Sequence, residues 1–247
     1  MESRRRFLAL TVSLVLAAAG SARADQAYNV SGNDSYQVGS DTGATNISYV
    51  GTQELETHGG RGDRRFVAIA TYTRTDQATQ VRLRARFVQE MEADGSLDDR
   101  SDQDPDFLTI LNQPFAIQLD ARTMRDLRDL RGSVPFEATS PLGGARLTGT
   151  LRPALAGIVD GVPVTGVRFS AQGPMTGTLP EHSDAQLEGT IRMNGTAYYA
   201  DHQALLLALD ATLTIEGTLH DKDVDMPVHI VYHRVIKAGP VPHNPIQ

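Results

Sequence analysis

The sequence lacks cysteine and tryptophan, and only two of its 23 basic residues, Lys222 and Lys237, are lysines. Without cysteine the chain has no disulfide, thiolate metal site, iron–sulfur cluster, cysteine nucleophile or lipidated N-terminal cysteine. Hydrophobic residues make up 40% and charged residues 21% of its 247 residues, which is typical of a globular chain rather than a disordered one. The net charge of −7 argues against nucleic acid as the main partner.

The N-terminus has the organisation of a signal peptide, which we predict to span residues 1–24. Three arginines precede an apolar stretch that runs from Phe7 to about Gly20, and the small residues Ala22 and Ala24 form a cleavage site. The apolar stretch is too short for a transmembrane helix, so no membrane span is expected after processing. Cleavage leaves 19 basic against 29 acidic residues, a net charge of −10, in residues 25–247. We expect this remainder to be a single β-rich domain.

The start of the signal resembles the twin-arginine export signal, in which an arginine pair is followed by one residue and then Phe-Leu. The matching residues are Arg4, Arg5, Phe7 and Leu8. The resemblance implies export of the folded chain to the periplasm by the twin-arginine machinery. An arginine-rich signal of the general secretory route is the alternative.

Alternation of apolar and polar residues is the dominant pattern after the signal. It is cleanest in 145–152, 186–194 and 210–220, where every second residue is apolar or glycine. This period of two predicts strands with one face in the core and one in water, as in an antiparallel sheet. Further strands are predicted at 27–38, 46–56, 65–75, 79–91, 115–119, 164–172 and 228–237. The ambiguous apolar segment 202–209 is interpreted as a strand because alternation follows it directly.

One short helix is predicted near 121–131. Asp120 is a suitable N-terminal cap, and Met124, Leu127 and Leu130 form a narrow apolar stripe. A single short helix cannot cover the apolar face of so many strands. The sequence therefore predicts an all-β, mainly antiparallel fold whose curved sheet forms a half-barrel or barrel-like structure, with the helix across its mouth.

Glycines recur in this pattern with a spacing of 28 residues. Gly149 is followed by Gly177, and Gly189 by Gly217, each within a similar Gly-Thr-Leu or Gly-Thr-Ile segment. The period suits a hairpin of two long strands, with glycine on the apolar face where the sheet bends sharply. Coincidence in a chain with 22 glycines is the alternative.

No motif in the sequence defines an active site or a metal site. Residues 41–44 match the aspartic peptidase tetrapeptide, but no second copy supplies the partner aspartate, so a turn is favoured. In the acidic segment 92–106, a calcium loop starting at Asp102 would need glycine at its sixth position and glutamate at its twelfth, where Phe107 and Gln113 stand, so a solvated loop is favoured. His229 and His233 are separated by about 13 Å if they lie in a strand, too far to share a metal ion. Glu54, Glu56 and His58 are expected to be a surface cluster.

Arg82, Arg84 and Arg86 are predicted to project from one face of a strand. They either grip an anionic group or, as we favour, pair with carboxylates across the sheet.

These observations favour an exported, non-enzymatic protein that binds or carries an apolar or amphipathic small molecule or lipid, by analogy of shape with periplasmic carriers. We predict that Phe169, Met193, Leu213 and Ile215 contact this ligand, and we expect no cofactor. The alternative is a structural or interaction module of the cell envelope with a solid β core. A hydrolase is the weakest hypothesis, because no nucleophile and base have recognisable spacing.

Overall fold

A computed structural model describes most of the chain after the predicted signal. The described residues are 26–40, 43–59, 64–77, 79–91, 97–99, 119, 121–129, 132–138, 146–179, 182–200, 205–222 and 224–239. The predicted signal peptide therefore lies outside the described residues. So do Asp41 and Thr42 of the segment that matches the aspartic peptidase tetrapeptide, and nearly all of the acidic segment 92–106. Among the described residues, no helix is long and apolar enough to cross a membrane.

The described residues form twelve strands and one helix. The elements are β1 (Gln26–Val38), β2 (Thr45–Gly59), β3 (Arg64–Thr75), β4 (Gln80–Met91), β5 (Leu97–Asp99), α1 (Ala121–Asp129), β6 (Val134–Ala138), β7 (Leu147–Pro153), β8 (Gly157–Val159), β9 (Val162–Leu179), β10 (His182–Ala200), β11 (Leu206–Asp221) and β12 (Val224–Gly239).

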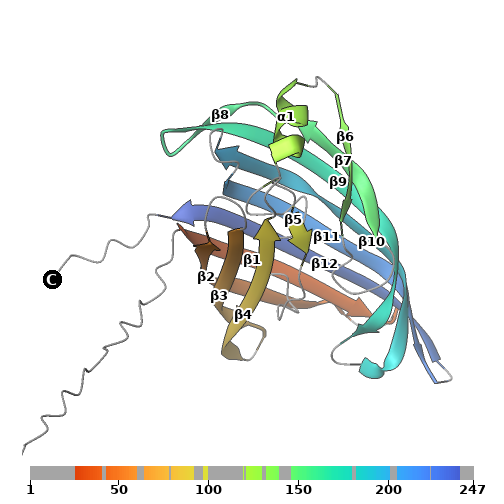
Figure 1. Cartoon of the computed structure of the whole chain (residues 1–247). Helices are drawn as coiled ribbons and strands as arrows, with labels where there is room; N and C mark the ends of the chain where they lie inside the picture. Colours follow the sequence, from red (N-terminus) through yellow and green to blue (C-terminus); the bar gives the residue numbers. More distant parts are fainter. Residues whose placement is uncertain are drawn as a thin grey trace, which may run out of the picture.

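All strands belong to one antiparallel sheet with the order β5-β4-β3-β2-β1-β12-β11-β10-β9-β7-β6, and β8 pairs with β9. The sheet consists of two meanders that are joined where the first strand pairs with the last, from Ala27 opposite Gly239 to Val38 opposite Val228. Figure 1 shows the sheet strongly bent, with β1–β4 in one wall and β6, β7 and β9 in the other. The edge strands β5 and β6 are not paired with each other, so the half-barrel is open.

The predicted fold class is confirmed. The all-β, antiparallel, curved sheet is present, and the predicted helix near 121–131 is α1. The segment 202–209 was interpreted as a strand, and its residues from Leu206 onward do form the start of β11. The short strands β5, β6 and β8 were not predicted, and the predicted strand 115–119 lies outside the described residues except for Leu119.

The inner face of the sheet carries the core. On β11, for example, Leu209, Ala211, Leu213, Ile215 and Leu219 are buried while the residues between them are more exposed. The buried apolar side chains form one cluster that extends from β1–β4 across β12 and β11 to β7.

The helix α1 completes one end of this core. Met124 and Leu127 are buried, as the apolar stripe predicts, and both belong to the core cluster. The main contacts of α1 are with β6 and β7. It therefore lies near the β6 edge of the sheet. Its expected position across the mouth of the half-barrel stays a prediction.

Several glycines lie where neighbouring strands approach closely. Gly189 and Gly217 lie directly opposite each other on β10 and β11. A Cβ atom on Gly189 would collide with the carbonyl oxygen of Glu216 and lie 2.7 Å from Cα of Gly217. The 28-residue spacing thus corresponds to a cross-strand pair in this case. Gly149 and Gly177, the other glycines with this spacing, are not a cross-strand pair, because Gly149 is opposite Ala171 on β9.

Candidate functional site

The four residues predicted to contact a ligand lie close together on the inner face. Met193 on β10 is directly opposite Leu213 on β11, and Ile215 is opposite Ile191 two residues further along. Phe169 on β9 is opposite Gly195 of β10, and a Cβ atom at Gly195 would lie 2.5 Å from Cζ of the Phe169 ring. All four side chains are buried in the core cluster. The structure therefore places them on one apolar surface, in contact with other protein side chains.

The inner face also contains a buried ion pair between Asp34 of β1 and Arg234 of β12. Both terminal nitrogens of the guanidinium group donate to the carboxylate, Nη1 to Oδ1 and Nη2 to Oδ2, and the second of these bonds measures 3.1 Å. The side chains are 0% and 3% exposed, respectively. Arg234 also donates from Nη1 to the carbonyl oxygen of His233 at 2.9 Å.

Aromatic side chains enclose this ion pair. The guanidinium carbon of Arg234 lies 4.7 Å from the centroid of the Tyr49 ring and 5.7 Å from that of Tyr232. The Tyr36 hydroxyl donates to Asp34 Oδ2 at 3.3 Å, and the Tyr36 and Tyr232 rings meet edge to face. Cation–π contacts and bidentate hydrogen bonding together satisfy a charge that water cannot reach.

The charge state of the pair follows from these contacts. Burial by itself lowers the pKa of Arg234, but the hydrogen bond and the negative charge of Asp34 outweigh burial, so the pKa is raised. Arg234 therefore stays charged at every accessible pH. Burial also raises the pKa of Tyr36, and the neighbouring Tyr232 and Asp34 add to the effect. The tyrosine remains a neutral donor.

Sequence reasoning missed the ion pair, although one signal was available. Arg234 occupies an apolar position in the alternation of β12, between the buried residues Tyr232 and Ile236. An arginine in that register indicates a buried partner. The sequence gives no indication that the partner is Asp34, 200 residues away.

Two glutamine side chains are buried on the inner face without a partner. Gln53 of β2 and Gln89 of β4 are both 0% exposed. Neither amide nitrogen nor oxygen of these side chains makes a hydrogen bond within the structure as described. Gln53 lies between Tyr28 and Ala70 on the neighbouring strands, and the Tyr28 hydroxyl donates instead to the carbonyl oxygen of Leu206 at 2.9 Å. Unsatisfied buried amides are rare and costly.

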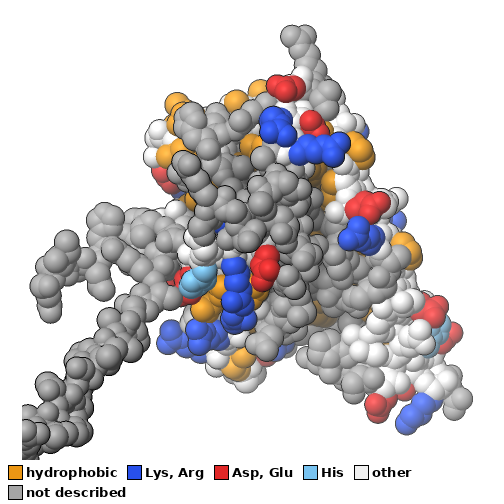
Figure 2. All heavy atoms as spheres, viewed as in Figure 1, with side chains coloured by type: hydrophobic (Ala, Val, Ile, Leu, Met, Phe, Trp, Pro, Cys, Tyr) orange, Lys and Arg blue, Asp and Glu red, His pale blue; other side chains and the backbone are white. Residues whose placement is uncertain are grey.

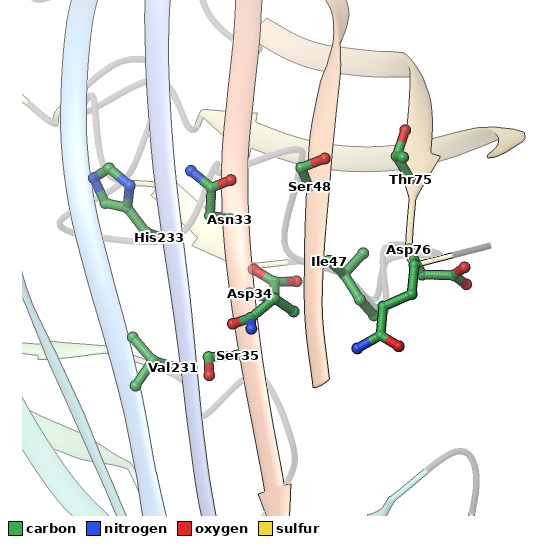
Figure 3. A pocket seen from close by; sticks show the side chains of 11 residues that line it. Asn33, Asp34, Ser35, Ile47, Ser48, Thr75, Asp76, Val231 and His233 are labelled. Atoms are coloured by element: carbon green, nitrogen blue, oxygen red, sulfur yellow. The ribbon is translucent and has the colours of Figure 1, made fainter. Parts of the chain in front are cut away.

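A pocket of about 640 Å³ opens at the end of β1, β2 and β3. Figure 3 shows that its labelled side chains come from β12, β1 and β2 and from the end of β3. Most are polar, including Asn33, Ser48, Thr75 and His233, whereas Ile47 and Val231 are the apolar residues of the lining. This pocket is large enough for a small ligand, but its lining does not match the expected apolar site.

The histidines and the carboxylate–histidine group contact different partners on the surface. His229 lies 3.9 Å from Glu216, and His233 lies 2.9 Å from Asp210. Both histidines are in β12, as the strand interpretation requires. His58 lies 3.3 Å from Glu56 at the end of β2. No group of three or more histidine, aspartate or glutamate side chains among the described residues is arranged to hold a metal ion.

The arginine ladder lies on the exposed face of β4, as predicted. Its cross-strand neighbours on β3 are Thr73, Thr71 and Ile69, opposite Arg82, Arg84 and Arg86 respectively. The favoured pairing with carboxylates is therefore wrong within the described residues. In Figure 2, Lys and Arg side chains gather over the part of the sheet that β2, β3 and β4 form.

No protein-family model matches the chain, and a search of the curated proteins finds no match. The function must therefore be inferred from the residues and the fold.

Proposed function

We propose that this is an exported carrier that binds an apolar or amphipathic small molecule against the inner face of its half-barrel. The observation that carries the proposal is an open sheet whose apolar inner face contains polar amides without partners. The apolar surface suits a hydrocarbon chain, and the amide of Gln53 offers both a donor and an acceptor to its polar end.

Access to this face requires the two walls to move apart. The inner-face side chains, among them Phe169 and Ile215, contact one another with almost no exposure. No ladder of backbone hydrogen bonds joins β5 to β6. Separation of these two described edge strands breaks no backbone pairing between them, whereas opening a closed barrel would.

Ligand retention by the processed chain tests the carrier. We expect native mass spectrometry of residues 25–247 after gentle purification to show bound lipid, and an apolar fluorescent dye to compete with it. Gln53→Leu is expected to weaken this binding several-fold and to raise the free energy of unfolding of the ligand-free protein by about 1–3 kcal/mol, because an unpaired buried amide is removed.

Exposed Gln186 provides the matched control. Gln186→Leu is expected to leave both ligand binding and stability within about 0.5 kcal/mol of the parent protein. A ligand-free mass together with no dye uptake would refute the carrier.

One observation favours a second function, an envelope interaction module. The buried apolar side chains already form one continuous cluster, as expected of a solid core. This module predicts a stoichiometric partner protein in purified samples and a Gln53→Leu variant that gains stability without any change in small-molecule binding.

Export is the other part of the proposal, and it rests on the N-terminal sequence. Conservative replacement of Arg4 and Arg5 by lysine keeps the charge but removes the arginine pair. We expect the precursor to accumulate in the cytoplasm, as measured by fractionation and immunoblotting. Unchanged export of this variant would favour the general secretory route.

A further inference from the structure

A second pocket lies on the outer face of the sheet, over β7, β9 and β10. Its volume is about 480 Å³. The lining residues combine two arginines with hydroxyl and amide side chains: Thr150, Arg152, Arg168, Phe169, Ser170, Asn194, Gly195 and Thr196. Phe169 and Gly195 belong to the inner-face rows, whereas the other six lining residues alternate with them toward the outer face. The pocket shares no lining residue with the polar pocket at the end of β1.

The register of the strands brings the two arginines together. Arg152 of β7 is directly opposite Arg168 of β9, and both are exposed. Thr196 of β10 is the next residue across the sheet. In the adjacent row, Ser170 lies between Thr150 and Asn194. Directly opposite residues have Cβ atoms about 4.5–5.5 Å apart, so two like charges in this arrangement destabilise the sheet.

Other arginines on this wall are neutralised, but these two are not. Arg146 pairs with Glu137 at 3.1 Å, and Arg192 pairs with Glu216 at 2.8 Å. Neither Arg152 nor Arg168 has an ion pair or a side-chain hydrogen bond in the part of the chain that the structure describes. In the row of Arg168, the next carboxylate is Asp210, two strands or about 10 Å away, and it already contacts His233.

We propose that Arg152 and Arg168 bind a phosphate monoester in this pocket. Guanidinium groups bind phosphate oxygens bidentately, and two of them match the charge of nearly −2 that a phosphate monoester carries at neutral pH. The hydroxyls of Ser170 and Thr196 and the amide of Asn194 supply further donors. A bound dianion converts the repulsion between the arginines into attraction, which explains why the pocket keeps two unpaired positive charges.

The phosphate group has two possible sources, a soluble phosphate or a lipid head group. The chain that connects β7 to β9 exposes apolar side chains: Leu155, just before β8, is 89% exposed, and Ile158 of β8 is 74% exposed. Such side chains are suited to contact the hydrocarbon of a lipid. The binding chemistry at the arginines is the same for both sources, and the experiment distinguishes them.

The test uses the processed chain in two parallel assays at low salt. One is calorimetric titration with inorganic phosphate, and the other is co-sedimentation with phosphatidylcholine vesicles with and without phosphatidic acid, a phosphate monoester lipid. The variant is the double replacement Arg152→Gln and Arg168→Gln. The matched control is Arg146→Gln with Arg192→Gln, which removes the same charge from the same wall.

We expect the parent protein and the control to bind one of the two phosphate probes, and the Arg152/Arg168 variant to lose at least about tenfold in affinity. Binding of inorganic phosphate identifies a soluble source, and binding of phosphatidic acid vesicles alone identifies a lipid source. Thermal unfolding of the variant is expected to be unchanged or higher, because a repulsion is removed. Binding of neither probe, or an equal loss in both double variants, would overturn the proposal.

Discussion

Replacement of Asp34 by alanine is expected to destabilise the protein by about 3–5 kcal/mol, measured by urea unfolding of the processed chain. The substitution leaves the guanidinium group of Arg234 buried without its carboxylate. The remaining contacts, a carbonyl oxygen and the Tyr49 and Tyr232 rings, do not compensate for the lost charge. The loss acts where β1 pairs with β12, the only junction between the two described meanders.

Two controls separate the buried charge from ordinary side-chain loss. Glu216→Ala breaks the exposed pair with Arg192, and its expected cost is at most about 1 kcal/mol. The double variant Asp34→Leu with Arg234→Met is expected to recover most of the stability, because an apolar pair no longer leaves a buried charge. An Asp34→Ala protein as stable as the Glu216→Ala protein would contradict this account.

Replacement of Gly189 by alanine is the second change with a large expected effect, a loss of about 3 kcal/mol in the free energy of unfolding. The added methyl group would collide with backbone atoms of Glu216 and Gly217, and backbone cannot move aside as a flexible side chain can. The cost is therefore at the upper end of the range for overpacking. The affected strands, β10 and β11, also carry Met193, Leu213 and Ile215 of the predicted ligand surface.

Gly157→Ala is the matched control for this prediction. Gly157 lies in the exposed strand β8, and a Cβ atom there would lie 4.0 Å from Val164, an ordinary contact. Its expected effect is within about 0.5 kcal/mol, measured in the same urea titration. Equal stabilities of the two variants would show that the sheet adjusts freely at Gly189 and that the glycine pair does not determine its bend.

In the candidate sites, the sequence predicted the face on which a residue lies and did not predict its neighbours on other strands. The inner-face positions of Phe169, Met193, Leu213 and Ile215 follow from the strand period. Their burial in the core cluster depends on side chains from distant strands, which the period of a single strand does not reveal. The pairing of Arg152 with Arg168 depends on a register that skips β8, because β7 pairs with β9 along residues 148–153.

The sequence by itself determined which segments form the long strands, which face of each of them is apolar and which residues form α1, because period-two and period-three patterns are properties of neighbouring residues. The short strands β5, β6 and β8 carry too few residues to show such a pattern. The tertiary structure alone decided that the first strand pairs with the last, that the edges β5 and β6 stay unpaired, and that Asp34 meets Arg234. Alternation specifies a face and carries no information about the adjacent strand. Pairing between distant strands is selected by the packing of the whole inner face, which only the folded chain brings together.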